Sequence, residues 1–314
     1  MSQVRVGVIG VGSMGKNHAR IYRSLDEADF IGVYDPDANV AKRICQQHGC
    51  QSFSSEEELL EQVEAISVAA PTSFHFTIAQ KALHAGVNVL VEKPVTETTA
   101  EARELADLAK AKSKVLQVGH IERFNPVLKA LEDRLTRARF IEAHRLSPYP
   151  GRSVDISVVM DLMIHDLEII LHLVKSPVQS VDAVGIPVLS KSEDIANARI
   201  RFENGCVANI TTSRISPEKM RKIRVFQDDA YLSLDYQKQA GEIYRKSGDT
   251  ISREKIAVEK DEPLKNQLAS FIHCVATGGD PVVSGVHAAQ ALQLAAQISE
   301  EIAKGPVPDF AQAE

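Results

Sequence analysis

A glycine motif between a strand and a helix constrains the fold of this chain more than any other feature. Apolar residues from Val4 to Ile9 predict a short buried strand, and a helix is expected from about Lys16 to Leu25. Between them, Gly10, Gly12 and Gly15 form Gly-x-Gly-x-x-Gly. Gly10 permits a tight turn, Gly12 lets a pyrophosphate approach the backbone, and Gly15 lets helix and strand pack closely. The motif therefore predicts a dinucleotide-binding unit.

An acidic residue at the end of the next strand indicates which dinucleotide is bound. The expected strand Phe30–Tyr34 ends at Asp35, which lies 20 residues after Gly15. A carboxylate at this place accepts hydrogen bonds from a ribose 2′-hydroxyl and repels a 2′-phosphate. The sequence therefore favours NAD over NADP as the cofactor.

Strands and helices continue to alternate up to about residue 118. Further strands are expected around Phe53 and at 65–70, 87–91 and 115–118, and further helices at 40–48, 56–63, 74–85 and 98–112. Such alternation is typical of α/β proteins with a doubly wound parallel sheet. We expect an NAD-binding Rossmann domain at residues 1–119.

A charged segment follows one of these apolar strands. Val91 is followed by Glu92, Lys93 and Pro94, and proline ends a strand because it lacks a donor N–H. In isolation, a Glu-Lys pair at a strand end is most simply an exposed charge pair. However, the carboxyl ends of parallel strands are where open α/β sheets bind ligands, which makes Lys93 a candidate for an active site.

The remaining residues, 120–314, indicate a second domain of α+β type. After an apolar helical segment at 158–171, several strand-like segments follow, with Asn204-Gly205 as a strong hairpin signal. These segments predict a mostly antiparallel open sheet, followed by two helices, of which the last packs back at the domain junction. An open sheet face usually finds a partner, so we expect a homo-oligomer, a dimer or a tetramer, formed through that face.

The helical segment at 158–171 carries polar residues at helical spacing. Asp161 and His165 are four residues apart and lie on one helix face, with Glu168 and His172 continuing the stripe. A carboxylate beside an imidazole can orient it for proton transfer. Two other interpretations remain: a core histidine satisfied by Asp161, and a metal-binding face, for which the sequence shows no completing ligand cluster and which we do not expect.

Composition excludes several classes of protein. The net charge of −6 gives no electrostatic basis for nucleic-acid or membrane binding, and no apolar run approaches the roughly 20 residues of a membrane span. No secretory signal precedes the first strand, and the four cysteines do not form a disulfide framework. We therefore expect a cytoplasmic protein with reduced thiols.

Several of these motifs together resemble those of the Gfo/Idh/MocA oxidoreductases. The similar residues are Ala70-Pro71-Thr72, His75, Ala85-Gly86, Val91-Glu92-Lys93-Pro94 and Asp161-x-x-x-His165-Asp166. The resemblance implies that Lys93 contacts both cofactor and substrate, and that His165 transfers the proton. It also implies that the active site lies where the two domains meet.

Motifs and resemblance together define the expected site. The catalytic residues are Lys93, His165 and Asp161. The cofactor-binding residues are Gly10, Gly12, Ser13, Met14, Gly15, Asp35, Pro71, Thr72, His75, Glu92 and Lys93. The substrate-binding residues are Lys93, Arg123, Asn125, Arg152, Asp161 and His165.

The stretch from Gly119 to Asp166 resembles the UDP-N-acetylglucosamine 3-dehydrogenases within this family. That resemblance implies a sugar-nucleotide substrate, a 3-keto product and a downstream aminotransferase as partner. The arginines available for its diphosphate are Arg123, Arg145, Arg152 and Arg214. Alternatives are another sugar, sugar nucleotide or cyclitol, such as UDP-N-acetylglucosaminuronate or inositol, or a non-catalytic NAD-binding regulator.

Overall fold

The computed structural model describes residues 3–149 and 156–305. These residues belong to two compact units. The first unit consists of Met1–Phe124 with Asp261–Gln290, and the second of Asn125–Lys260 with Ala291–Glu314.

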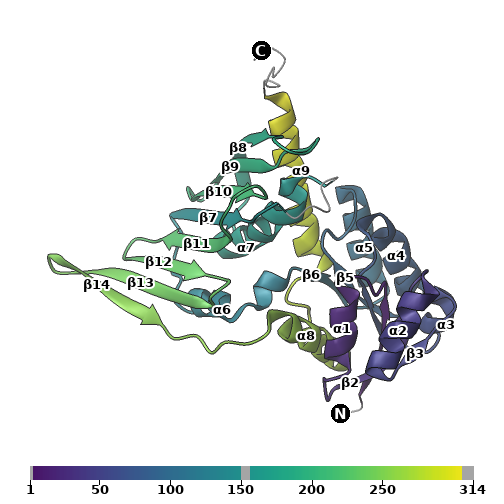
Figure 1. Cartoon of the computed structure of the whole chain (residues 1–314). Coiled ribbons are helices and arrows are strands. Elements are labelled where there is room, and N and C mark those ends of the chain that lie inside the picture. The colour runs from purple at the N-terminus through teal and green to yellow at the C-terminus, as the bar shows by residue number, and fades with distance from the viewer. Residues whose placement is uncertain (1–2, 150–155, 306–314) are drawn as a thin grey trace. The chain divides into compact units, whose positions relative to one another are not determined.

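The first unit is built on a six-stranded parallel sheet (Figure 1). Its strands are β1 (Val4–Ile9), β2 (Ala28–Tyr34), β3 (Gln51–Ser52), β4 (Ala65–Val68), β5 (Asn88–Glu92) and β6 (Leu116–Gly119). They lie in the order β3-β2-β1-β4-β5-β6. The order reverses direction between β1 and β4, and ligands of such sheets bind beyond the carboxyl ends of the strands at this point.

Helices connect these strands, as expected for a doubly wound sheet. They are α1 (Gly15–Tyr22), α2 (Ala38–His48), α3 (Glu56–Leu60), α4 (His75–His84) and α5 (Thr99–Ala111), with 3₁₀ turns at Thr72–Phe74 and Ile121–Phe124. The predicted parallel Rossmann sheet is confirmed.

One helix from the end of the chain completes the core of the first unit. The apolar side chains Leu264, Leu268, Phe271 and Ile272 of α8 (Pro263–Thr277) are buried in one cluster with residues of α1, β1 and β2. Each such side chain contributes roughly 1.5–3 kcal/mol through burial. The sequence predicts that all residues after 119 belong to the second domain. The structure differs for Asp261–Gln290, because the apolar stripe of α8 packs on α1 and β1.

A capping motif explains the closest pair of thiols. Helix α2 ends at Gly49, whose φ of +62° and N–H bond to the Cys45 carbonyl, 2.8 Å, form a left-handed C-cap. The N–H of Cys50 also donates to the Cys45 carbonyl, and the two Sγ atoms lie 3.2 Å apart. Such motifs bring these two side chains into contact, and all four cysteines are free thiols.

The second unit is built on an eight-stranded sheet in the order β14-β13-β12-β11-β7-β10-β9-β8. Its strands are β7 (Phe140–Leu146), β8 (Val178–Ile186), β9 (Ile195–Phe202), β10 (Val207–Ser213), β11 (Met220–Phe226), β12 (Ala230–Asp235), β13 (Ala240–Ser247) and β14 (Thr250–Ile256). Only the pairing of β7 with β10 is parallel among those described. The prediction of a mostly antiparallel sheet is confirmed.

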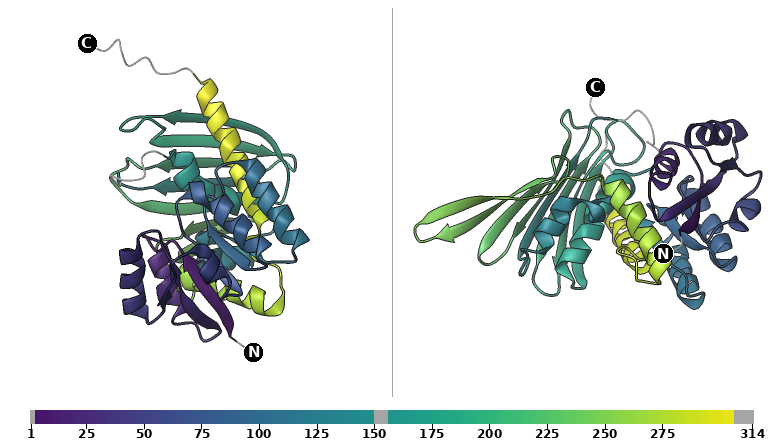
Figure 2. Two further views of the ribbon diagram at one scale, coloured as in Figure 1. Left: turned by 90° about the vertical axis from the view of Figure 1, so that its right-hand side faces the viewer. Right: turned by 90° about the horizontal axis from the view of Figure 1, so that it is seen from below.

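Alternating burial gives this sheet one covered face and one open face. In β9, Ala196, Ala198, Ile200 and Phe202 are buried while the residues between them are not. The helices α6 (Pro126–Glu132) and α7 (Ile164–Val174) lie on the covered face, and β13 and β14 extend as a hairpin beyond the other strands (Figures 1 and 2). The last helix is α9 (Gly285–Lys304).

Within the two described ranges, no helix is both long enough and apolar enough to cross a bilayer.

Candidate active site

The glycine loop has the geometry that its sequence predicts. Gly10 has a φ of +82°, and a Cβ atom there would lie 2.7 Å from the Ala70 nitrogen. A Cβ on Gly15 would lie 1.9 Å from the Gly10 carbonyl oxygen. A Cβ on Gly12 would meet no described atom within 4 Å, and the residue is exposed. The close contacts at Gly10 and Gly15 are therefore structural, whereas Gly12 leaves open space above the loop.

The N-terminus of α1 follows this glycine loop directly and has no side-chain cap. Its N-cap residue, Met14, makes no side-chain capping bond. The first N–H groups of a helix have no partner within the helix, and with the helix dipole they favour a bound anion. Ser13 is exposed and Met14 half-buried at the same turn.

The carboxylate of Asp35 links the glycine loop to the turn that follows β2. Its Oδ2 accepts the Val11 N–H at 2.8 Å, and its Oδ1 accepts the Asp37 N–H at 2.9 Å. The side chain is half-buried. Each carboxylate oxygen has two lone pairs, so these backbone bonds fix the group and still leave capacity for a ribose hydroxyl.

Lys93 follows β5 and is itself half-buried. The Lys93–Pro94 peptide bond is cis. The preceding Glu92 is buried, and its Oε1 lies 3.2 Å from Nε2 of the fully buried His18 on α1. The Glu92 carboxylate also lies over Gly119, where a Cβ would come within 2.6 Å of it. Glu92, at the end of β5, therefore links the strand that precedes Lys93 to α1, the helix that follows the glycine loop.

The ring of His75 bridges the loop after β4 and the loop after β5. Its Nδ1 lies 2.8 Å from the Pro94 carbonyl oxygen and its Nε2 lies 2.8 Å from the Ala70 carbonyl oxygen. The ring is buried, and burial lowers its pKa, while the two carbonyls and the charge of Glu92 act in the opposite direction. With both nitrogens engaged by the backbone, His75 supports the exposed Pro71 and half-buried Thr72 rather than extending beyond them.

His120, which the sequence analysis did not single out, lies close to Lys93. The pKa of this buried side chain is lowered to about 3, first by burial and then by the positive charges of Lys93 and Arg123. His120 is therefore neutral at physiological pH. Its place directly after β6, at the same edge of the sheet as Lys93, is the signal that could have identified it.

The predicted substrate-binding residue Asn125 lies at the start of α6. Asn125 is buried, accepts the Val127 N–H at 3.2 Å as the N-cap of α6 and donates to the Tyr236 carbonyl at 3.1 Å. These bonds give its amide a structural role, which differs from the expected contact with substrate. Arg152 lies outside the described residues.

In the second unit, Asp161 and His165 lie at the start of one helical segment. The sequence predicts one continuous helix here, whereas the structure has a π-helical turn at Val159–Met163 followed by α7. Both polar side chains are half-buried, with Met163 and Ile164 buried between them. Single π-turns inside helices are rare and occur frequently at functional sites.

Two arginines expected to be available for a diphosphate are buried in ion pairs instead. Nε of Arg145 lies 2.7 Å from Oδ2 of Asp166, and Nε of Arg214 lies 2.8 Å from Oδ1 of Asp194. Both guanidinium groups are almost completely buried. The expectation for Arg145 and Arg214 is therefore wrong, because a buried guanidinium is held by the carboxylate that compensates its charge.

The polar stripe of Asp161, His165, Glu168 and His172 does not form a metal site among the described residues. Glu168 is buried, and His172 Nε2 pairs with Glu132 Oε1 at 2.9 Å. Over residues 3–149 and 156–305, no group of three or more His, Cys, Asp or Glu side chains could hold a metal ion.

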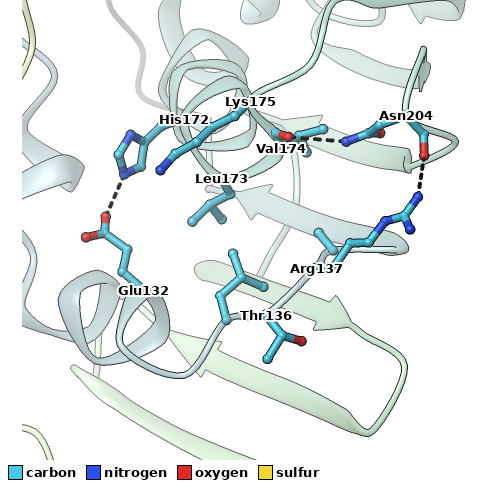
Figure 3. A pocket seen from close by; sticks show the side chains of 10 residues that line it. Glu132, Thr136, Arg137, His172, Leu173, Val174, Lys175 and Asn204 are labelled. Atoms are coloured by element: carbon cyan, nitrogen blue, oxygen red, sulfur yellow. Dashed lines mark hydrogen bonds and ion pairs between the residues drawn. The ribbon is translucent and has the colours of Figure 1, made fainter.

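A pocket of about 250 Å³ lies at the opposite end of α7 (Figure 3). It is lined by Glu132, Leu135, Thr136, Arg137, Ala138, His172, Leu173, Val174, Lys175 and Asn204. A helix rises about 1.5 Å per residue, so His165 at the start of α7 is roughly 10 Å from the residues of this pocket. The pocket is therefore separate from the Asp161–His165 segment.

Both units match known families. The Gfo/Idh/MocA oxidoreductase family with its NAD-binding Rossmann fold matches residues 4–120, and the Gfo/Idh/MocA C-terminal domain matches residues 133–233. This chain belongs to the Gfo/Idh/MocA family. The recognition made from the sequence motifs is confirmed.

Among its Gfo/Idh/MocA relatives is the UDP-N-acetylglucosamine 3-dehydrogenase of Acidithiobacillus ferrooxidans. It is 36% identical over 95% of this chain and 97% of its own length, and its solved structure matches with a TM-score of 0.92 over 96% and 98% of the two chains. An inositol 2-dehydrogenase of Leifsonia xyli is 31% identical over 57% of this chain and 56% of its own length. A levoglucosan dehydrogenase in complex with NADH and levoglucosan, 19% identical with a TM-score of 0.87 over 98% and 100% of the chains, shares the fold.

The first unit of this Gfo/Idh/MocA member fits NAD, its family's cofactor. The open space above Gly12 and the uncapped N-terminus of α1 suit a pyrophosphate, and the fixed carboxylate of Asp35 suits a ribose bearing free hydroxyls. The protein is an NAD-dependent oxidoreductase.

Proposed function

We propose that this chain oxidises the 3-hydroxyl of UDP-N-acetylglucosamine to a ketone. The observation that carries the proposal is its 36% identity to a UDP-N-acetylglucosamine 3-dehydrogenase over nearly the whole length of both chains. The matched region includes both units, so it covers the glycine loop and Lys93 as well as Asp161 and His165.

In this proposal each protein group has one task. NAD, when bound, accepts the hydride from the carbon that carries the hydroxyl. His165 removes the hydroxyl proton, so that the C–H bond breaks as the carbonyl forms. The Lys93 ammonium donates a hydrogen bond to the same oxygen and stabilises its developing negative charge. Asp161 orients His165 or binds another hydroxyl of the sugar.

The geometry of the glycine loop and of the neighbouring strand ends supports the following assignment of binding residues, which is part of the proposal. Gly10, Gly12, Ser13, Met14 and Gly15 receive the pyrophosphate, Asp35 the ribose, and Pro71, Thr72 and Lys93 lie along the nicotinamide half, with Glu92 and His75 supporting them from within. For the substrate we retain Lys93, Arg123, Asp161 and His165. Arg152 stays a prediction.

A cyclitol substrate is the second candidate. The inositol 2-dehydrogenase of Leifsonia xyli is 31% identical to this chain, although over little more than half of either length. A non-catalytic NAD-binding regulator is disfavoured because Lys93 and His165 are both present.

A substrate panel separates these candidates. The protein is incubated with NAD and, separately, UDP-N-acetylglucosamine, UDP-N-acetylgalactosamine, UDP-N-acetylglucosaminuronate and myo-inositol, and the NADH absorbance band is followed. We expect NADH with UDP-N-acetylglucosamine and a new ketone at carbon 3 by NMR. Tight NAD binding without NADH from any compound would favour the regulator, and oxidation of inositol alone would favour the cyclitol dehydrogenase.

Retained NADH would conceal turnover in that panel. A single-turnover measurement with protein in excess of the sugar detects the ketone even when NADH stays bound. Adding a sugar-nucleotide aminotransferase with an amino donor tests the proposed partner, because it removes the ketone and draws the unfavourable oxidation forward. We place this reaction in the cytoplasm, in keeping with the free thiols.

A further inference from the structure

The residue that follows His165 is fixed by a buried arginine. Asp166 accepts two parallel bonds from Arg145 of β7, from Nε to Oδ2 at 2.7 Å and from Nη2 to Oδ1 at 3.0 Å. Both side chains are almost completely buried, with exposed fractions of 3% and 2%. A bidentate pair of this kind fixes direction as well as distance, because both groups are planar.

The chain just before the π-helical turn is fixed as well. The Ile156 carbonyl accepts a bond from Nη1 of Arg214 at 2.5 Å, and Arg214 is held by Asp194. The Val158 N–H donates to the Glu193 carbonyl at 3.2 Å. The segment that carries Asp161 and His165 is therefore attached to the sheet side of the second unit at both ends.

These attachments oppose the relaxation that a π-turn would otherwise undergo. A π-turn contains one residue more than the α-helical path between the same ends, so it can become α-helical only if one flanking segment shifts by a residue. Each residue of an α-helix is rotated by about 100° from the next, so a flank that shifts by a residue also rotates about the helix axis, and the polar side chains that it carries change direction relative to the sheet. The bond from Arg145 to Asp166 prevents the shift on the α7 side.

We propose that Arg145 and Asp166 are positioning residues, which hold the π-helical turn and thereby aim His165 and Asp161 at the reacting hydroxyl. This inference rests on the proposed role of His165. A buried ion pair is a poor source of stability, since well-packed apolar residues of similar volume often replace it without loss. Position, rather than stability, is what this pair supplies.

The test compares single and double variants with matched control changes. Asp166→Asn keeps the shape but removes the charge, and Arg145→Met with Asp166→Leu replaces the pair by apolar side chains. We expect Asp166→Asn to lower kcat roughly 10–100-fold with little change in the KM for NAD, because a displacement of about 1 Å costs up to roughly 10²-fold. The double variant should regain thermal stability without regaining kcat. His172→Gln, which removes an ion pair at the other end of α7, should leave kcat unchanged.

A spectroscopic measurement keeps this inference separate from the identity of the substrate. With ¹⁵N-labelled histidine, the His165 signals are assigned by their loss in His165→Gln. We expect these signals to move in Asp166→Asn and in the double variant, and to stay in place in His172→Gln. Unchanged His165 signals, or wild-type kcat in the double variant, would overturn the positioning role. If the His165 signals move in these variants but no sugar gives NADH with the wild type, only the proposed substrate would be overturned.

Discussion

At the scale of the single residue, the charge of Lys93 is the feature whose loss should be felt most directly. Lys93→Met keeps most of the side-chain volume and removes the donor and the positive charge. We expect kcat to fall by roughly 10²–10³, the usual contribution of one electrostatic group at a developing oxyanion. Steady-state kinetics with UDP-N-acetylglucosamine measures the loss, and the affinity for NAD, followed by fluorescence titration, should fall much less.

A matched lysine controls for the substitution. Lys81 on α4 is paired with Glu56 and Glu57 at the surface of the same unit. Lys81→Met should leave kcat near the wild-type value. Near-normal turnover in Lys93→Met would remove this residue from the proposed mechanism.

His120 predicts how stability depends on pH. Its pKa is lowered to about 3 by burial and by the charges of Lys93 and Arg123, against 6.5 in the unfolded chain. Between these values only the unfolded state takes up the proton. The contribution of neutral His120 to the free energy of unfolding is therefore fully present above pH 6.5. It is lost as the pH falls, by up to about 1.4 kcal/mol per pH unit.

Denaturant unfolding at a series of pH values tests this dependence. We expect His120→Asn to flatten the decline in the free energy of unfolding between about pH 6.5 and about pH 5. His84→Gln changes an exposed histidine of the same unit and should keep the wild-type slope. An unchanged slope in His120→Asn would show that His120 takes up a proton as readily in the folded protein as in the unfolded chain.

At the scale of the element, the glycine loop allows folding and cofactor binding to be separated. Gly15→Ala places a Cβ atom 1.9 Å from the Gly10 carbonyl oxygen, so strand and helix must move apart. Gly12→Ala meets no described atom within 4 Å. We expect Gly15→Ala to lower the melting temperature and Gly12→Ala to leave it unchanged while weakening NAD binding. Calorimetry of unfolding and of NAD binding measures both, and undiminished NAD affinity in Gly12→Ala would contradict the placement of the pyrophosphate.

The elements of the first unit were largely predictable because their signals are local. Apolar runs, the glycine motif and Asp35 lie within short stretches, and the strand ends that carry Lys93 and Pro71 follow from them. The bond from Asn125 to the Tyr236 carbonyl and the buried pairs of Arg145 and Arg214 depend on residues 20 or more positions away, so local patterns do not reveal them.

The π-helical turn was missed for a related reason. Its residues have the apolar periodicity of an ordinary helix, and the extra residue is visible only from the hydrogen bonds that hold both ends. The association of α8 with the first unit likewise depends on which surface its apolar stripe meets, which a stripe alone does not specify.

At the scale of the whole molecule, the open face of the eight-stranded sheet is the surface that remains to be assigned. The rings of Phe140, Phe226, Tyr231 and Tyr244 form a row across four neighbouring strands, with successive centroids 5.6, 4.6 and 5.1 Å apart. All four side chains are partly exposed. A row of aromatic rings with both apolar area and polar edges is typical of protein interfaces. We therefore keep the proposal that this face binds a second copy of the chain.

Tyr231→Glu tests that proposal, because Tyr231 lies in the middle of the row, stacked on both Phe226 and Tyr244. A carboxylate here would lose its hydration on association, so we expect the variant to elute as a monomer under conditions where the wild type is a dimer or tetramer. Multi-angle light scattering at several protein concentrations gives the mass directly. Val286→Glu changes an exposed apolar side chain of α9 in the first unit and should keep the wild-type mass. A monomeric wild type, or an unchanged mass in Tyr231→Glu, would mean that the row of rings serves the sheet itself and not a second chain.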